Sequence, residues 1–440
     1  MNPAGKLDVE DPYSPSLGRE SIKSSETEIP FANFNFPEGG LEAWEVCLGS
    51  FLLYFTSFGF QNAFGVFQAY YSNEMAGGPL ASPWAISWIG SFQVFMTFFA
   101  GLLSSSLLDR MSVKVVVTAG TLIHVTSCML LSISTTYWAV FLTQGLMQGV
   151  GIGILFAPAL TCTSHYFNVR RGLALGIVAS GSSLGGCCWP IALDRLIHHG
   201  PGFGWALRIC GFIILAILAA VVPLMNQRLP RAVKRDSFFD WSAFKHTGYD
   251  LLLVSQFFVY LGLFFIYYYL PYLGSINGMS ANAVFYLASA SNGASFFGRI
   301  LAGLIGDRLG RFNVLTIALL LSATIIYSTI AVVPQRDGQV TASLFVIASC
   351  YGLVTGAFFA LQAATVVSLV TDVKRVGTWI GMLYGAISLP ALFGPPIGSQ
   401  IFQHHSFPDA LAFAGSCVVV GAIFMVASRS TVSKKLWVAV

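Results

Sequence analysis

The chain has 440 residues, of which 55% are hydrophobic and only 10% are charged, and its net charge is +4. Soluble domains are about one-quarter charged, so this composition excludes an ordinary water-soluble fold and favours a lipid environment. The eight cysteines lie in or beside apolar runs without Cys-x-x-Cys or Cys/His spacing, so we expect packing residues and no metal site.

Polar segments divide the chain into a tail, two groups of apolar runs and a linker. Residues 1–43 are rich in Ser, Pro, Glu and Asp, which predicts a disordered cytosolic tail without a cleaved signal peptide. A membrane-spanning helix needs about 20 mostly apolar residues. The first group (44–226) has such runs at 45–70, 84–107, 114–134, 138–163, 172–194 and 205–225. After a linker at 227–248, the second group (249–428) has runs at 249–272, 281–305, 312–333, 341–366, 377–402 and 408–428, before a cytosolic tail at 429–440.

The basic residues between the runs predict the orientation of the chain. Sixteen Lys and Arg residues fall on one side, in loops and in the C-terminal tail, against three on the other, Arg195, Arg208 and Arg336. Because loops rich in Lys and Arg stay in the cytosol, we expect both termini there. The same distribution accounts for the positive net charge, so we expect no nucleic-acid partner. The plasma membrane is the expected location, with the vacuolar membrane as the alternative.

The two groups of runs look like copies of one six-helix unit. Asp109 and Arg110, after the second run, recur as Asp307 and Arg308, 198 positions later. Five residues around the fifth run recur 205 positions later around the eleventh: Arg170, Gly172, Gly176, Ser183 and Pro190 become Arg375, Gly377, Gly381, Ser388 and Pro395. Such parallel repeats place a substrate site near the membrane midplane, between the halves. We therefore predict an all-α membrane protein with twelve transmembrane helices in two pseudo-symmetric six-helix bundles.

The loop after the eighth run resembles the signature loop of the major facilitator superfamily, and the resemblance implies that fold. Residues 303–311 read Gly-Leu-Ile-Gly-Asp-Arg-Leu-Gly-Arg, whereas the first-half loop keeps only the acid–base pair. A carboxylate at a helix end can pair with arginine and with a helix terminus, and such a pair can break when the halves rock. We therefore expect a gate made by Asp109, Arg110, Asp307, Arg308 and Arg311. The alternative is an ordinary cytosolic loop that only sets the orientation.

Two further stretches are similar to the monocarboxylate porter branch of that family. Residues 38–44, Glu-Gly-Gly-Leu-Glu-Ala-Trp, resemble its entry motif, and residues 166–176, Tyr-Phe-Asn-Val-Arg-Arg-Gly-Leu-Ala-Leu-Gly, resemble its motif at the fifth helix. We add Arg170 and Arg171, from the second motif, to the expected gate. The branch includes importers of short carboxylates, a vitamin importer and fungal proteins linked to export of secondary metabolites. The resemblance implies transport without fixing the substrate or its direction.

The apolar runs contain few ionisable residues, and these mark function because burying them is costly. No acidic residue or lysine lies deep in a run, which leaves Arg299 and His124, the latter expected to be a packing residue. Arg299 matches the arginine with which the monocarboxylate branch holds a substrate carboxylate. The alternative is an arginine satisfied by backbone carbonyls and Ser or Asn side chains. The aspartate and lysine of proton-coupled members are replaced by Ser295 and Asn62, so we expect an anionic or strongly polar substrate and absent or unconventional coupling.

Other polar and aromatic residues of the runs are candidates for the same site. The first, fourth, seventh and tenth helices line the cavity in the family fold, so we expect substrate contacts from Gln61, Asn62, Gln144, Gln148 and Gln362, with hydrogen bonding between helices as the alternative. The seventh run ends in aromatic residues that include Tyr267, Tyr268, Tyr269 and Tyr272. These form either an aromatic belt at the membrane surface or, with Tyr54 and Tyr384, a ring-stacking lip for a bulky conjugated substrate.

Together these features predict a secondary active or facilitative transporter of a small organic anion or polar metabolite, working by alternating access. Efflux of a fungal secondary metabolite is the favoured interpretation, and import of a monocarboxylate or a vitamin-like nutrient is the alternative. A non-transporting membrane sensor stays open as a third hypothesis. The sequence has no clustered nucleophile, base or metal ligands and no phosphate-binding loop, so we expect no enzyme activity, cofactor or ATP hydrolysis. The expected partners are a small-molecule substrate and the lipid bilayer, around a monomer.

Overall fold

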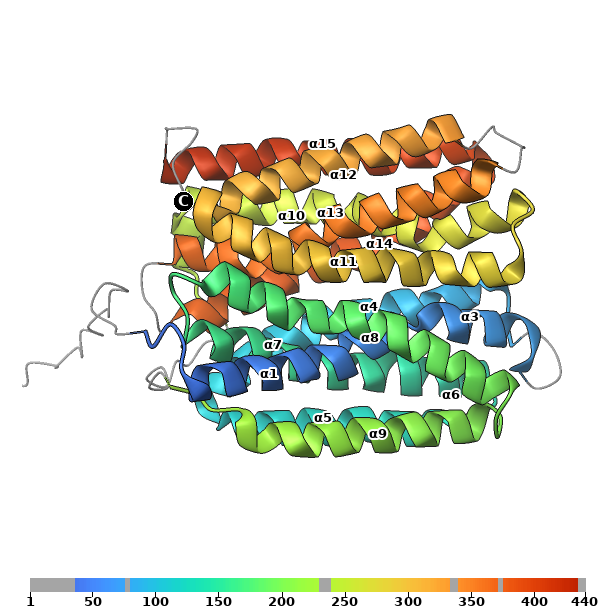
Figure 1. Cartoon of the computed structure of the whole chain (residues 1–440), viewed down its shortest axis with the longest axis horizontal. Helices are drawn as coiled ribbons and strands as arrows, with labels where there is room; N and C mark the ends of the chain where they lie inside the picture. Colours follow the sequence, from blue (N-terminus) through green and yellow to red (C-terminus); the bar gives the residue numbers. More distant parts are fainter. Residues whose placement is uncertain (1–35, 76–79, 229–238, 333–338, 371–374, 434–440) are drawn as a thin grey trace, which may run out of the picture.

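The computed structural model describes residues 36–75, 80–228, 239–332, 339–370 and 375–433. Within these ranges every regular element is a helix (Figure 1). Most of the predicted N-terminal tail, most of the linker and residues 434–440 of the predicted C-terminal tail lie outside the described residues.

The first half of the chain forms six units of membrane-spanning length. The first unit is broken into α1 (Leu41–Thr56), α2 (Phe58–Gln61) and α3 (Phe64–Asn73). Two single helices follow, α4 (Pro83–Arg110) and α5 (Val113–Leu131). The fourth unit joins α6 (Tyr137–Val140), the π-helix η3 (Phe141–Gln148) and α7 (Gly149–Ser164). The half ends with α8 (Arg171–His198) and α9 (Phe203–Leu224).

The second half begins with a short 3₁₀ turn, η4 (Ala243–Lys245), and continues with α10 (Thr247–Ile276), α11 (Ala281–Leu309), α12 (Arg311–Val332), α13 (Gln339–Leu369), α14 (Val376–His404) and α15 (Phe407–Val432). Among the described residues, eleven helical stretches are long and apolar enough to cross a membrane. The remaining long helix is α11, which contains Arg299, Asp307 and Arg308 and packs against α8 and α13. The predicted all-helical membrane fold is therefore confirmed.

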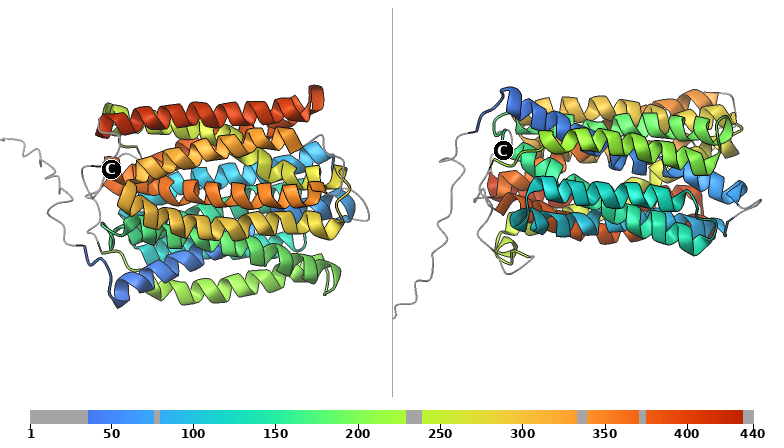
Figure 2. Two further views of the ribbon diagram at one scale, coloured as in Figure 1. Left: turned by 45° about the horizontal axis from the view of Figure 1, so that its top comes forward. Right: turned by 90° about the horizontal axis from the view of Figure 1, so that it is seen from below.

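The helices lie side by side in two groups, α1 to α9 and α10 to α15, with their axes along the long direction of the molecule (Figure 1). The groups meet where α8 packs against α11 and where α4 packs against α14. The same packing is visible from two further directions (Figure 2). The described chain begins and ends at one end of the molecule, on the left of Figure 1. We call this end, where α1 begins and α15 ends, the terminal face.

Serine side chains cap the N-termini of four of the long helices. Ser82, Ser112, Ser280 and Ser406 each accept a hydrogen bond from the backbone N–H three residues later, at 3.3, 3.4, 3.3 and 3.3 Å. Each bond satisfies one of the free donors that every helix N-terminus leaves. The chain turns from α11 into α12 at Gly310, whose φ of 92° lies in a region that favours glycine.

Hydropathy predicts the long helices but not their exact form. The first unit is interrupted at Ser57 and again at residues 62–63, and the fourth contains the π-helix. The helices also extend past the apolar runs: α1 begins at Leu41, inside the predicted tail, and α15 continues to Val432, beyond the predicted boundary at 428. Polar residues at a helix end leave the apolar window without ending the helix, because their side chains reach water there.

Glycines let α8 lie directly against the first unit. A Cβ at Gly181 would lie 2.2 Å from the carbonyl oxygen of Phe51, and one at Gly185 would lie 2.5 Å from that of Phe55. The indole of Trp189 donates to the same Phe55 carbonyl at 2.9 Å. Small residues permit this close backbone approach between membrane helices.

Large apolar side chains remain exposed on the outer helices. Examples are Leu122 on α5 (58% exposed), Phe212 on α9 (57%) and Ile423 on α15 (62%). In water, so much exposed apolar surface would drive association. Lipid covers the same surface without such a penalty, so the outside of the bundle suits a bilayer.

We expect the substitution Gly185→Ala to lower the thermal unfolding temperature of the purified protein, because the added methyl group has no room beside Phe55. Overpacking of this kind costs roughly 1–3 kcal/mol. The matched control is Gly293→Ala on α11, where a Cβ would meet nothing within 4 Å. Alanine favours a helix over glycine by about 1 kcal/mol, so the control should unfold at the wild-type temperature or slightly above it. Equal unfolding temperatures for Gly185→Ala and the wild type would contradict this packing.

Candidate functional site

Aromatic side chains of both halves meet between the two groups of helices. Phe98 of α4 stacks on Tyr384 of α14, with ring centroids 5.7 Å apart and planes at 11°. Phe156 of α7 meets Tyr384 edge-on at 4.5 Å, and Phe98 meets Tyr260 of α10 edge-on at 5.5 Å. Among the rings that surround these four are Tyr54, Phe58 and Phe358. We call these seven residues the central aromatic cluster.

The predicted site residue Gln362 holds the second-half side of this cluster together. Its side-chain oxygen accepts from the Tyr260 hydroxyl at 2.9 Å, and its nitrogen donates to the Tyr384 oxygen at 3.3 Å. The structure thus brings Gln362 and Tyr384, two of the predicted substrate contacts, to the same place. Sequence analysis missed Phe98, Phe156 and Phe358, because apolar rings on membrane helices look like ordinary packing residues.

Arg299 of α11 is buried beside the cluster, with 6% of its surface exposed. Its Nη1 donates to the carbonyl of Ala179 and to the hydroxyl of Ser182, both on α8 of the other half. The guanidinium carbon lies 5.2 Å from the ring centroid of Phe359, which adjoins Tyr260. The Nε atom has no hydrogen-bond partner. In this conformation Arg299 therefore has the carbonyl and serine partners of the alternative interpretation.

Of the two residues that replace the usual charged partners of this arginine, Ser295 bonds across the halves and Asn62 bonds within the first half. Ser183 of α8 donates to the hydroxyl of Ser295 at 3.1 Å. Asn62 donates from its side chain to the carbonyl of Ser182 at 3.2 Å. Among the described residues no carboxylate forms an ion pair with Arg299.

The three predicted glutamines of the first half bond to other side chains of that half. Gln61 accepts from Thr97 at 3.2 Å, Gln144 accepts from Tyr71 at 2.5 Å, and Gln148 accepts from Gln93 at 2.8 Å. These bonds link neighbouring helices, as in the alternative interpretation. In this conformation these hydrogen bonds stabilise the first half.

The tyrosines at the end of α10 also contact residues of their own half. Tyr267 shares a hydrogen bond of 2.5 Å with Thr355 of α13. Tyr269 stacks on Phe265 at 4.5 Å and meets Phe402 at 5.8 Å. Tyr268 packs on the ring of Phe264, one turn earlier in the same helix. The ring contacts of these tyrosines therefore fit packing within the second half.

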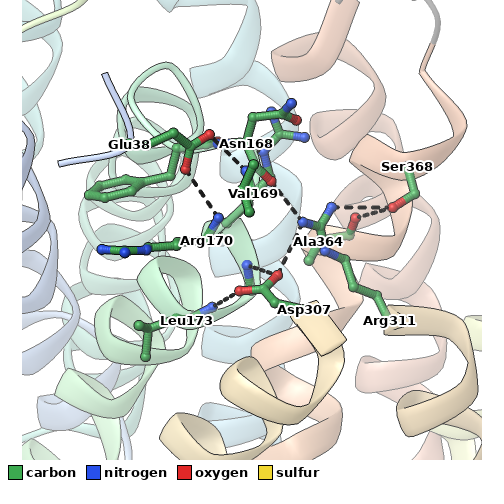
Figure 3. A network of polar contacts seen from close by, with 12 residues as sticks. Glu38, Asn168, Val169, Arg170, Leu173, Asp307, Arg311, Ala364 and Ser368 are labelled. Atoms are coloured by element: carbon green, nitrogen blue, oxygen red, sulfur yellow. Dashed lines mark hydrogen bonds and ion pairs between the residues drawn. The ribbon is translucent and has the colours of Figure 1, made fainter. Parts of the chain in front are cut away.

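At the terminal face, a carboxylate of one half binds the helix N-terminus of the other (Figure 3). Asp307 of α11 accepts from the backbone N–H groups of Gly172 and Leu173, each at 2.8 Å. Arg311 donates to Asp307 at 3.1 Å and to the carbonyl of Asn168 at 3.0 Å. A helix N-terminus is positively polarised and has free N–H groups, so it is a favourable place for this negative charge.

A second carboxylate, Glu38, binds the loop just before the same helix (Figure 3). It accepts from the backbone N–H groups of Asn168, Val169 and Arg170, at 2.7, 2.7 and 3.1 Å. Glu38 has φ of 54°, an uncommon conformation for a residue with a side chain. The motif residues of 38–44 and 166–176 are therefore in direct contact, since Tyr166 also donates to Glu42 at 2.8 Å.

The predicted gate residues differ in the contacts that they make. Asp307 and Arg311 bridge the halves, and the backbone of Arg170 binds Glu38. The buried side chain of Arg171 donates to the carbonyl of Phe167 at 2.9 Å, within its own half. The side chains of Arg110, Arg170 and Arg308 are exposed at the terminal face, and that of Asp109 lies outside the described residues.

The second half has an acidic residue in the corresponding place before its first long helix. Asp240 accepts from Arg375 at 3.4 Å and from the indole nitrogen of Trp379 at 3.1 Å. Both partners lie where α14 begins, as the partners of Glu38 lie where α8 begins. Sequence analysis did not single out Asp240, because no motif surrounds it.

The first half contains two buried histidines, His124 and His165. His124 approaches the carbonyl of Thr56 at 3.2 Å and packs edge-on against Phe60, as expected for a packing residue. His165 follows α7, and burial together with the nearby Arg171 lowers its pKa to about 3. It therefore stays neutral over the physiological range of pH.

Comparison with known proteins places these features in a family. Residues 46–249 and 252–437 match the model of the Major Facilitator Superfamily. The aspyridones efflux protein apdF of Emericella nidulans is 37% identical over 88% of this chain and 78% of its own length. The agnestins efflux protein AgnL12 of Paecilomyces divaricatus is 35% identical over 99% of this chain and 96% of its own. The MFS-type transporter pynF of Aspergillus niger is 35% identical over 90% of both chains.

Solved structures show the same fold at low sequence identity. The human organic anion transporter MFSD10 superimposes with a TM-score of 0.67 at 14% identity, over 88% of this chain and 100% of its own. The FucP transporter in the outward conformation superimposes with a TM-score of 0.63 at 15% identity, over 88% of this chain and 98% of its own. The family match, the relatives and the fold agree. The chain is a membrane transporter of the major facilitator superfamily.

Proposed function

We propose that this transporter exports a flat, conjugated metabolite that carries a negative charge or a strong hydrogen-bond acceptor. The observation that carries the proposal is the central aromatic cluster, whose rings come from both halves, beside the buried guanidinium of Arg299. Aromatic side chains offer large, rigid surfaces on which a conjugated molecule stacks. A guanidinium forms two parallel hydrogen bonds with a carboxylate. The efflux of aspyridones and agnestins, for which two relatives are named, supports export of a fungal secondary metabolite.

The same contacts suggest how binding is linked to movement of the halves. The substrate would enter between rings such as Phe98 and Tyr384, which now touch across the interface. It would also replace Ala179 and Ser182 as partners of Arg299. In each case a contact with the substrate replaces a contact between the halves. Binding of the substrate would therefore favour separation of the halves, and separation would favour binding. Of the predicted contacts, Arg299, Gln362 and Tyr384 fit this role best, whereas Asn62, Gln61, Gln144, Gln148 and Tyr267 would join only after rearrangement.

At the terminal face, we assign Asp307 and Arg311 to the gate of alternating access, with Glu38 and Arg171 shaping the loop that they bind. Bonds across the halves at one end must break before that end opens. Asp109, Arg110, Arg170 and Arg308 would act with them as charged neighbours. The excess of basic residues supports a cytosolic terminal face. We propose the plasma membrane as the location, with the vacuolar membrane as the alternative.

The motifs at 38–44 and 166–176 support a place in the monocarboxylate porter branch, and their mutual contact through Glu38 fits a shared role. The absence of a carboxylate partner for Arg299 among the described residues supports transport without the usual proton carrier. Import of a monocarboxylate remains the second candidate, because a guanidinium holds a carboxylate in either direction of transport. We propose a monomer as the working unit, since each substrate site would lie within one chain.

Deletion of the gene should raise the intracellular level of one conjugated acidic metabolite and lower its level in the medium, both measured by metabolite profiling of the producing organism. Reintroduction of the wild-type gene should restore both levels. Loss of uptake of a supplied compound, with no change in export, would favour the import alternative. Unchanged levels on both sides of the membrane would rule out export as proposed.

In the same strain, Arg299→Gln should reproduce the deletion, with export reduced roughly tenfold or more, because the anion loses a charged and hydrogen-bonded partner. Arg299→Lys should keep part of the activity, since it retains the charge but not the planar fork. Both variants must reach the membrane in wild-type amounts, which quantitative immunoblotting checks. Full export by Arg299→Gln would contradict a substrate role for this residue.

Asp307→Asn should favour separation of the halves at the terminal face, because it removes the charge that binds the N-terminus of α8. Hydrogen bonds to a charged group contribute about 1.5–3 kcal/mol. Spin labels at Val169 and Leu309, both exposed and in different halves, report the distance across this face. The control is Asp409→Asn, whose bond to Ser406 of 2.6 Å lies at the opposite face within one half. A distance distribution in Asp307→Asn identical to the wild type would contradict a gating role.

A further inference from the structure

One buried glutamine has no hydrogen-bond partner. Gln256 of α10 is 0% exposed, and neither its side-chain oxygen nor its nitrogen is bonded. The other buried glutamines of the described residues all bond to a side chain: Gln61, Gln93, Gln144, Gln148 and Gln362. Since buried amides are nearly always hydrogen-bonded, this exception needs an explanation.

The helix face on which Gln256 lies points towards the functional region. Tyr249, seven residues earlier, and Tyr260, four residues later, share that face, since both spacings are close to whole turns. Tyr249 donates to the carbonyl of Trp379 on α14 at 2.7 Å, and Tyr260 donates to Gln362 on α13 at 2.9 Å. Ser255, in contrast, faces α15, because it donates to the carbonyl of Gly421 at 2.6 Å. Gln256 therefore lies towards α13 and α14, on the terminal-face side of Tyr260.

This position is close to the central aromatic cluster. Four residues of α10 correspond to about 6 Å along the helix axis, so the backbone positions of Gln256 and Tyr260 are about one turn apart. Tyr260 contacts Phe359, over whose ring Arg299 lies. The Nε of Arg299 is a further buried polar atom without a partner. Two sets of unpaired polar atoms thus border one group of rings.

We propose that Gln256 is a substrate-binding residue that recognises a group with a hydrogen-bond donor beside an acceptor. A carboxamide has both functions in one plane and pairs with a lactam, a protonated carboxylic acid or an enolised dicarbonyl through two parallel hydrogen bonds. Arg299 takes the anionic or acceptor group, and Gln256 takes this second group. Because Gln256 is on the terminal-face side and sealed here, the substrate reaches it when that face opens. The inference rests on the proposed function and adds a chemical requirement for the substrate.

The first test uses the protein without ligand. Gln256→Leu replaces the unpaired amide by an apolar group of similar size, so it should raise the thermal unfolding temperature of the full-length protein in detergent. The matched control, Gln93→Leu, removes the donor that Gln148 accepts at 2.8 Å, so it should lower the unfolding temperature. A fall for Gln256→Leu comparable to that of the control would show a structural bond and overturn the proposal.

The second test uses two flat probes that differ in one donor, 2-quinolone and N-methyl-2-quinolone, with binding measured by the shift in unfolding temperature. The wild type should bind 2-quinolone about tenfold more tightly than the N-methyl compound, as expected for one lost hydrogen bond. Gln256→Leu should bind both equally. A preference that persists in the variant, or no preference in the wild type, overturns the proposal.

A third probe separates this inference from the proposed function. 2-Naphthoate has a flat ring and a carboxylate, so it should stabilise the wild type and Gln256→Leu but not Arg299→Gln. If 2-naphthoate behaves in this way while the quinolones are not distinguished, the role of Gln256 is wrong and that of Arg299 stands. If none of the three probes stabilises the wild type, both proposals fail.

Discussion

Two helices of opposite halves, α8 and α11, touch backbone to backbone, and both functional regions depend on that contact. A Cβ at Gly176 would lie 2.5 Å from the carbonyl oxygen of Arg299, and one at Gly303 would lie 2.3 Å from that of Gly172. Because a larger side chain would hold the helices apart, glycine allows Asp307 to reach the N-terminus of α8 and Arg299 to reach Ala179. The contact continues towards the opposite face, where Asn292 donates to the carbonyl of Gly186 at 3.4 Å. One packing constraint thus sets the position of the arginine and of the proposed gate.

The second contact between the halves repeats the first in geometry but not in chemistry. Gly381 of α14 faces Ser105 of α4, where an added Cβ would lie 2.4 Å from the hydroxyl oxygen. These residues are the repeat partners of Gly176 and Gly303, at offsets of 205 and 198 positions. The repeat partner of Arg299 is Gly101, where an added Cβ would lie 2.3 Å from the ring of Phe156. A symmetric scaffold therefore carries a guanidinium on one side and aromatic rings on the other, so a molecule between them meets two different surfaces.

The sequence was sufficient to predict the fold and the family, because hydropathy, loop charge and repeats each reflect the membrane. It also predicted that the motif residue Asp307 lies at a helix end, and that Arg299 is the ionisable residue of the interior. It did not predict that Gln61, Gln144 and Gln148 bond within the first half, since which helices face one another depends on three-dimensional packing. For the same reason the partners of Glu38, 130 and more positions away, could not be found from spacing. The role of rings such as Phe98 depends on the residues that they contact in the other half, which the sequence does not show.

The missing counter-ion of Arg299 has a consequence for energetics across the membrane. Among the described residues no acidic group forms an ion pair with this arginine, so the empty site carries a positive charge into the membrane field. One charge that crosses the whole field changes the free energy by about 2.3 kcal/mol per 100 mV, and partial movement changes it in proportion. A bound monovalent anion neutralises the site, so the voltage then acts little on the loaded protein. The membrane potential would therefore act mainly on the return of the empty carrier, and the electrical dependence of transport would lie in that step.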